Sequence, residues 1–219
     1  MERHFHERLR ELKGKMITMS RLAQYMIESA MEGLVKGNPE FAEQVFEKEK
    51  LVNLLEIEID NQGHTLLALA QPMAVDLRSI TTILKINTDL ERIADHAVNI
   101  AEKVREMMGE AYSDLEIKLP EMAAHVREVL NDAVDSFIRE DVQLAQQVLK
   151  KDDKIDDYND TFYSQLEDYI QTNPFRARRG MSLARISHEL ERIGDLANNI
   201  AEDVIYATQG KEVRHHADR

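Results

Sequence analysis

Apolar side chains recur at steps of three and four residues along most of the chain, which is the spacing of an amphipathic helix. The first such stripe runs from Leu9 to Leu34 and stops at Gly37-Asn38-Pro39. Asparagine is a preferred residue for capping a helix start, and proline is common at the first helical position. The pattern therefore predicts one helix that ends before Gly37 and a second that begins at Pro39.

Breaks in the pattern divide the rest of the chain into further helices. The second helix is predicted to continue through residues 39–70, and the third to run from about residue 74 to residue 108. Residues 109–119 have the composition of a linker. After this linker, the same spacing predicts three more helices, over about residues 120–139, 142–171 and 178–208.

The second half of the chain repeats the first. Residues 83–102 align with residues 183–202 at an offset of 100, and eleven of these twenty positions are identical. Residues 44–49 align with residues 147–152 at an offset of 103. Self-similarity over this period indicates duplication of a three-helix unit. We therefore predict an all-α protein of two tandem antiparallel three-helix bundles, in residues 1–110 and 111–219, the second ending in a short polar tail.

Composition supports long helices and excludes several kinds of site. Only 8 glycines and 4 prolines interrupt 219 residues, and the absence of cysteine excludes disulfides, iron–sulfur clusters and thiol nucleophiles. A formal net charge of −13, without a block of Lys or Arg, makes nucleic acid and an anionic bilayer unfavourable partners. Because no apolar leader and no apolar run of about 18 residues is present, we expect a cytoplasmic protein that reaches a membrane only through partners.

Two copies of the motif Leu-Glu-Arg-Ile-(Ala/Gly)-Asp carry the acids of greatest interest. Glu91 and Asp95 in the first copy, like Glu191 and Asp195 in the second, are one helical turn apart. They lie roughly opposite the apolar stripe of their helix, so we expect them to face solvent, a partner or an ion. Like charges at this spacing destabilise an isolated helix by about 0.2–0.5 kcal/mol. Their occurrence in both halves makes a bound cation as good an explanation as a solvated face.

The fifth predicted helix adds Asp152 and Asp156, again four residues apart. If this helix lies beside the sixth, these acids converge with the second motif copy on a site of four carboxylates, which suits Mg²⁺, Mn²⁺, Ca²⁺ or iron. The matching positions of the first half are Glu49 and Asn53, which supply one carboxylate fewer. We therefore predict that the first site binds a cation more weakly or less completely.

The acidic pattern leaves three classes of function open. The sequence lacks the Glu-x-x-His pairs of ferritin-like di-iron proteins, a nucleophile motif and a glycine-rich phosphate loop, so oxygen chemistry and independent catalysis are not expected. A regulatory adaptor is the leading interpretation. A metal-dependent hydrolase or metal-storage bundle is the alternative, and a structural helical spacer is the third. Scattered histidines such as His96 are expected to be surface or boundary residues.

Both motif copies resemble one known family. Residues 71–78 followed by residues 89–102, and residues 189–202 in the second half, are similar to the PhoU family of phosphate-uptake regulators, and the resemblance covers essentially the whole chain. It implies two three-helix bundles, a cytoplasmic and frequently homodimeric protein, and multinuclear metal, which is iron or else Mn, Mg, Ca or Zn. Carried over residue by residue, the metal motifs fall on Glu91, Asp95, Glu191, Asp195, Asp152 and Asp156.

The resemblance also implies a function. It implies negative control of phosphate uptake and of the phosphate-starvation response, through the ATPase subunit of an ABC-type phosphate transporter and a phosphate-sensing histidine kinase. Two departures from the family pattern are visible. Asn53 replaces an acid, and the second half has Arg178-Arg179-Gly180 where the first has Asp76-Leu77-Arg78. Any contact made by that Asp-Leu-Arg segment is therefore expected once in the chain.

Overall fold

A computed structural model of the chain describes residues 2–70, 73–107, 118–172 and 174–210, which form long α-helices and one 3₁₀ turn. The elements are α1 (Glu2–Lys36), α2 (Glu40–Ala70), α3 (Ala74–Glu106), α4 (Leu119–Arg139), α5 (Val142–Thr172), η2 (Pro174–Arg176) and α6 (Ala177–Gln209). The prediction of an all-α protein with six helices is confirmed. The breaks between helices fall within about two residues of the predicted ones.

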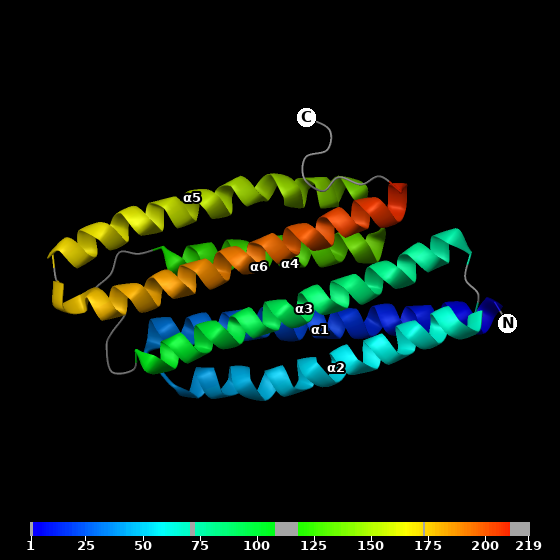
Figure 1. The fold of residues 1–219 in the computed structure, drawn as a ribbon, viewed down its shortest axis with the longest axis horizontal. Coiled ribbons are helices and arrows are strands. Elements are labelled where there is room, and N and C mark those ends of the chain that lie inside the picture. The colour runs from blue at the N-terminus through cyan, green and yellow to red at the C-terminus, as the bar shows by residue number, and fades with distance from the viewer. Residues whose placement is uncertain (1, 71–72, 108–117, 173, 211–219) are drawn as a thin grey trace.

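The helices form two groups of three that lie side by side (Figure 1). α1, α2 and α3 pack on one another in the first group, and α4, α5 and α6 do so in the second. The groups meet through α1 against α4 and α3 against α6, and α3 and α6 run antiparallel. The division predicted at residues 110/111 falls outside the described residues.

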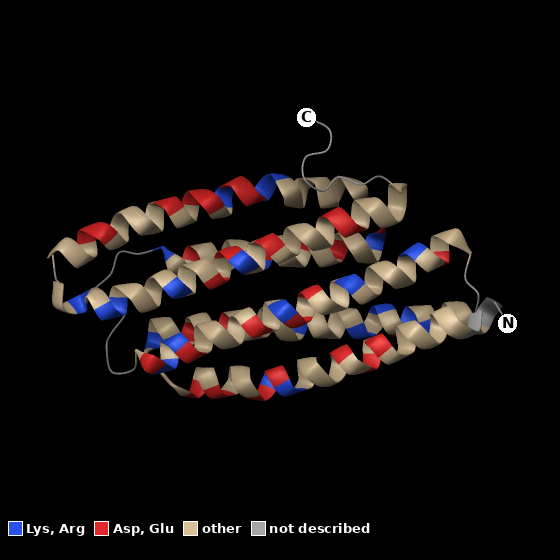
Figure 2. Cartoon of the chain, viewed as in Figure 1, with Lys and Arg blue, Asp and Glu red and all other residues tan. Residues whose placement is uncertain are grey.

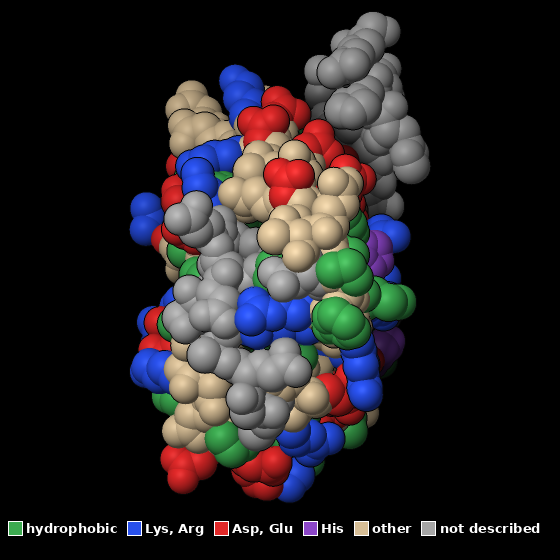
Figure 3. Space-filling view, turned by 90° about the vertical axis from the view of Figure 1, so that its left-hand side faces the viewer, with side chains coloured by type: hydrophobic (Ala, Val, Ile, Leu, Met, Phe, Trp, Pro, Cys, Tyr) green, Lys and Arg blue, Asp and Glu red, His purple; other side chains and the backbone are tan. Residues whose placement is uncertain are grey.

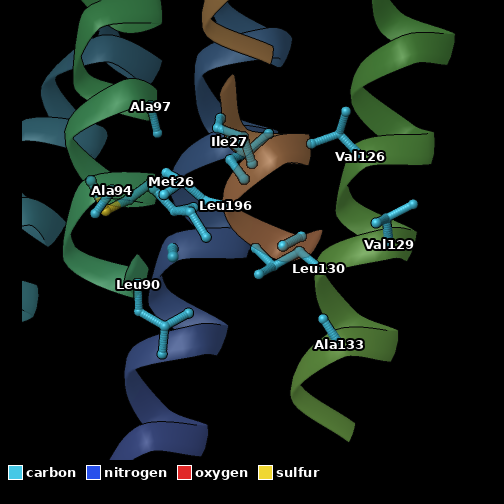
Figure 4. Packing of buried hydrophobic residues seen from close by; sticks show 14 of the residues in the cluster. Met26, Ile27, Leu90, Ala94, Ala97, Val126, Val129, Leu130, Ala133 and Leu196 are labelled. Carbon is cyan, nitrogen blue, oxygen red and sulfur yellow. The ribbon is translucent and has the colours of Figure 1, made fainter. Parts of the chain in front are cut away.

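The apolar core is continuous across the two groups. Figure 4 shows Met26 and Ile27 of α1, Leu90 of α3, Leu130 of α4 and Leu196 of α6 meeting between them. These side chains are buried. Because a fully buried leucine or isoleucine contributes about 1.5–3 kcal/mol, this shared layer fixes the two groups relative to each other.

Charged residues occur along the helices of both groups (Figure 2). Acidic residues occur along much of α5. At the α5–α6 turn the surface is different, because Phe175 and Met181 are exposed beside the exposed Arg178. Figure 3 looks onto this end, where hydrophobic and basic side chains lie next to each other. Among the described residues, no helix combines the length and apolarity that crossing a membrane requires.

A buried carboxylate, Glu189, joins α6 to α3. Its side chain is 1% exposed, its Oε2 lies 2.6 Å from Nδ1 of His96, and Nδ2 of Asn99 donates a hydrogen bond to Oε2 at 3.1 Å. Nε of Arg185 lies 2.6 Å from the other oxygen. Burial acts to raise the pKa of Glu189, but the hydrogen bonds from His96 and Asn99 and the charge of Arg185 hold it below its usual value. His96 is thus a boundary residue between the two groups.

The α1–α2 and α4–α5 turns, which are equivalent in the duplication, each have a side-chain cap at the start of the following helix. Oδ1 of Asn38 accepts a hydrogen bond from the backbone N–H of Glu40 at 2.9 Å, and Oδ1 of Asp141 accepts one from Gln143 at 2.9 Å. The predicted cap at Asn38 is therefore confirmed. The residue before each cap is left-handed, with φ of 62° at Gly37 and 55° at Glu140. Glycine takes this conformation without the steric cost of a side chain.

Alanine at two glycines is expected to change stability in opposite directions. An added Cβ meets nothing within 4 Å at Gly14 or at Gly37, so a difference between the two variants cannot come from steric clashes. Inside α1, Gly14→Ala raises the free energy of unfolding by about 0.5–1 kcal/mol. Gly37→Ala lowers it by about 1 kcal/mol, because alanine is strained at a positive φ. Urea titration followed by circular dichroism measures both, and shifts of the same sign would contradict the assignment.

Neutralising Glu189 is expected to destabilise the fold in a pH-dependent way. Glu189→Gln lowers the free energy of unfolding by about 1.5–3 kcal/mol at neutral pH, because hydrogen bonds to a charged acceptor are lost. The folded-state pKa lies below the unfolded value of 4.5, so the wild-type advantage is fully present above that value and is lost as pH falls through the folded-state pKa.

Urea titrations of the Glu189→Gln variant from about pH 7 to about pH 3 test this expectation. The difference from wild type should close in acid, and a difference that does not change with pH would argue against a stabilising charge. Glu32→Gln is the control, because Glu32 is an exposed acid whose pair with Lys36 contributes little.

Candidate functional site

The duplicated acids lie on helix faces turned away from the apolar core, as expected. In α3, Leu90 is fully buried, whereas Asp95 is exposed and Glu91 is partly exposed. In α6, 32% of the Glu191 side chain and 48% of the Asp195 side chain remain exposed. Each pair faces the outer helix of its own group, because Glu91 lies within electrostatic range of acids on α2 and Glu191 accepts a hydrogen bond from α5.

The second-half acidic cluster consists of Asp152 and Asp156 of α5 with Glu191 and Asp195 of α6. Burial and then the negative charges of Glu191 and Asp195 raise the pKa of Asp156. Burial also raises the pKa of Asp152, against a hydrogen bond from Asn198, and the charges of Asp156 and Asp195 add to the rise. The structure thus places the acids predicted on separate helices within electrostatic range of one another.

Neighbouring polar groups orient the acids of α6. Nδ2 of Asn159 donates to Oε2 of Glu191 at 3.1 Å, and Oδ1 of Asn159 accepts a hydrogen bond from the buried Ser187 at 2.8 Å. Nη1 of Arg192 lies 3.2 Å from Oδ2 of Asp195. Glu191 is therefore held by a chain that starts in the core, whereas Asp195 is held by an exposed arginine.

The first-half acidic cluster consists of Glu49 and Glu56 of α2 with Glu91 and Asp95 of α3. Burial raises the pKa of Glu91, and the charges of Asp95, Glu56 and Glu49 raise it further. Burial, Asp60 and Asp95 raise the pKa of Glu56 in the same way. Asn53, the predicted fourth member, donates from Nδ2 to Oε1 of Glu49 at 3.4 Å and so lies beside the cluster.

Glu56 was not among the residues predicted from the sequence. At the offset of 103 its equivalent is Asn159, and the equivalent of Asn53 is Asp156, so acid and amide have exchanged places between the halves. The sequence did indicate Glu56 in one respect. It lies three residues after Asn53, and this spacing keeps both residues on the face of α2 that meets α3. Each cluster therefore has four carboxylates. The weaker binding that we predict for the first site would come from the positions of its carboxylates and not from their number.

The donor set fits hard cations, although the side chains are not gathered around one point. Among the described residues, no three His, Asp or Glu side chains are close enough together to hold a metal ion as they stand. The ligands are all carboxylate oxygens, which suit Mg²⁺, Mn²⁺, Ca²⁺ or iron. Burial first and then mutual repulsion raise the pKa values of Glu56, Glu91, Asp152 and Asp156, and a cation would offset both. Binding would require the carboxylates to rotate toward the ion.

A cavity of about 490 Å³ adjoins the second-half acidic cluster. Asp152 and Asp195 line it from α5 and α6, and Arg92 and His96 line it from α3. The cavity therefore includes residues of both halves. Any ion held by Asp152 and Asp195 would lie close to the contact between the two helical groups.

Comparison with known proteins agrees with this architecture. The PhoU domain family matches residues 16–104 and 119–204. A phosphate-specific transport system accessory protein PhoU homolog from Aquifex aeolicus is 38% identical over 94% of each chain, and one from Clostridium acetobutylicum is 32% identical over 95% of this chain and 96% of its own. The crystal structure of PhoU from Pseudomonas aeruginosa superposes with a TM-score of 0.89 at 32% identity, covering 94% of this chain and all of that one. Both repeats and the whole fold are thus shared, and the chain belongs to the PhoU family.

Proposed function

We propose that this protein is a cytoplasmic regulator of phosphate uptake and phosphate homeostasis, an adaptor that catalyses nothing itself. The observation that carries the proposal is the match of both repeats, over nearly the full chain, to accessory proteins of the phosphate-specific transport system. Negative control of the starvation response and contact with the transporter ATPase and a phosphate-sensing histidine kinase follow from the resemblance stated for the motifs. Control of this kind requires a signal that changes the adaptor.

We propose that cations at the two acidic clusters provide such a signal or stabilise the state that partners recognise. Support comes from the pKa values of Glu56, Glu91, Asp152 and Asp156, which burial raises and which neighbouring negative charges raise further. A cation would favour the ionised acids and remove the repulsion. Because Asp152 also lines the cavity between the halves, cation binding there would act where the two groups meet.

Titration calorimetry with Mn²⁺ tests the two clusters separately. A Glu191→Gln/Asp195→Asn variant retains the first cluster, and a Glu91→Gln/Asp95→Asn variant retains the second. We expect the variant with the intact second cluster to bind Mn²⁺ more tightly, because Asn53 stands where the second has Asp156. Binding should weaken as acid protonates the carboxylates, and Mn²⁺ should raise the melting temperature only where a cluster remains.

The Mn²⁺ experiment has two informative alternatives. Equal affinities would show that Glu56 fully replaces the carboxylate absent at Asn53. No heat and no change in melting temperature with either variant or with wild type would contradict the proposed cation sites. A Glu32→Gln variant, which alters an acid outside both clusters, controls for general loss of negative charge.

Complementation of a strain that lacks its own copy of this gene tests the regulatory role. Wild-type protein should keep a starvation-responsive promoter repressed in high phosphate, and alanine at Glu91, Asp95, Glu191 and Asp195 together should release that repression several-fold. Promoter activity and uptake of labelled phosphate are the measurements. Intact repression by the alanine variant would favour a helical spacer. Turnover of phosphate esters by purified protein, abolished by Glu191→Ala, would favour the hydrolase alternative.

A further inference from the structure

A row of basic side chains follows the contact between α3 and α6. On each of these helices a basic residue recurs every seven positions, which keeps the three within an arc of about 40° on one face. Five of the six residues are exposed and the first is partly exposed. Figure 2 shows blue segments along both helices, whereas much of α5 is red. We call these six residues the basic row, which consists of Arg78, Lys85 and Arg92 on α3 and Arg178, Arg185 and Arg192 on α6.

Contacts between the two helices show that the row is continuous. Nε of Arg78 donates a hydrogen bond to a backbone carbonyl of α6 at 3.2 Å, and Nζ of Lys85 lies 3.1 Å from Oδ1 of Asp203. Arg92 and Arg192 both line the cavity of about 490 Å³. Because α3 and α6 run antiparallel, the α6 members continue the row from this cavity toward the opposite end of the molecule. Each helix contributes about 21 Å of its length.

The duplication retains the basic charges but not their partners. Lys85 pairs with Asp203 of the opposite helix, whereas Nε of its equivalent Arg185 lies 2.6 Å from Glu189 of its own helix. At the offset of 100 the equivalent of Asp203 is Lys103, so the acid that holds Lys85 is not repeated. The feature common to both halves is therefore the positive charge at the surface and not one internal ion pair.

We propose that the basic row binds inorganic polyphosphate, a narrow and flexible chain of negatively charged phosphoryl groups. Five of the six residues are arginines, whose planar guanidinium groups bind phosphoryl oxygens through paired hydrogen bonds. Exposed internal pairs, such as that of Arg192 with Asp195, contribute little and can exchange for phosphoryl oxygens. The choice of a phosphate polymer rests on the proposed role in phosphate homeostasis, whereas the existence of the row does not.

Acidic side chains on both sides limit the width of the ligand. The first-half acidic cluster lies between α2 and α3, and the second-half acidic cluster lies between α5 and α6. Packed helices are about 8–10 Å apart, so both clusters are within about one helix of the row. A flat anionic bilayer or a nucleic acid duplex would bring phosphates over these acids and be repelled. A single polyphosphate chain is narrow enough to follow the row alone.

The side chains between the basic residues favour polyphosphate over two other narrow anions. These side chains are Thr81 and Thr88 on α3 and Met181 and His188 on α6. A single-stranded nucleic acid gains much of its affinity from bases stacked on aromatic side chains, and here the four residues offer one histidine ring. An acidic helix of a partner protein would need an apolar centre to its interface, and of the four only Met181 is apolar. A ligand held by charge alone fits better.

Fluorescence anisotropy of end-labelled polyphosphate, titrated with the full chain, tests the proposal. A chelator is present throughout, so that metal ions at the acidic clusters do not bridge protein and ligand. Wild type should bind, and its affinity should fall steeply with salt, because each contact releases counterions. If polyphosphate behaves as a single-stranded polyanion, six contacts give a slope of about −4 for log affinity against log salt concentration.

Two double variants separate the basic row from general charge. Arg92→Gln/Arg192→Gln removes the two basic residues at the cavity, and should weaken binding at least about tenfold and reduce the slope to about −3. Arg21→Gln/Lys150→Gln is the matched control, because it removes two exposed basic residues of α1 and α5. It should change the affinity by less than about twofold, since distant charges are screened. Circular dichroism confirms that each variant is folded.

Competition identifies the anion. Unlabelled polyphosphate should displace the labelled chain at a much lower concentration of charged groups than polyglutamate, oligothymidylate or phosphatidylglycerol vesicles do. Absence of binding by wild type, equal weakening by the two double variants, or equal competition by any of the other three anions would each overturn the inference. Such a failure would leave the regulatory role intact, because the promoter measurement of that role uses no polyphosphate, and a failed complementation would leave the binding measurement unaffected.

Discussion

The packing of α3 against α6 is the interaction on which the rest of the structure depends. Each of these helices contacts the core of its own group on one side and the other group on a second side. The side toward α2 or α5 is the one that carries the acid pairs Glu91/Asp95 and Glu191/Asp195. Glu91 and Glu191 are therefore directed to the same kind of place in both halves, which is the boundary between an inner and an outer helix. The apolar layer in Figure 4 thus determines where the acids lie, although it includes none of them.

The two halves preserve this packing and differ in their polar contacts. His96 and the buried Glu189 form a pair between α3 and α6, but at the offset of 100 their equivalents are Leu196 and Asp89. The contact between His96 and Glu189 is therefore not repeated at the equivalent positions, where Leu196 is part of the shared core instead. The duplication keeps the apolar stripe because it fills the same space twice. Polar contacts across the interface are free to differ, because each depends on a partner in the other half.

Sequence patterns predicted the parts of the fold that depend on local interactions. A helical repeat, the cap at Asn38 and the turn near Asp141 each depend on residues within a few positions of one another. The predicted helix ends were therefore close to the observed ones. The acids of the second-half cluster were also predicted, because the repeat and the spacing of four residues between acids are both visible in the sequence. Glu56 was missed because membership of a cluster depends on which side chains reach across from a neighbouring helix. The contact of His96 with Glu189 required the register between two helices 93 positions apart in sequence.

The proposed cation sites would link the stability of the fold to the ions around the protein. In an unfolded chain, the acids of α2 and α3, like those of α5 and α6, are far apart and repel weakly. Folding buries them and brings them together, so burial and then repulsion raise the pKa of Glu91 and Asp152, and both oppose the stabilisation by the apolar layer. A cation that binds only the assembled cluster would stabilise the folded state in proportion to its own affinity and concentration. The formal charge of −13 is therefore unevenly distributed, because two sets of four acids lie at the boundaries between an inner and an outer helix.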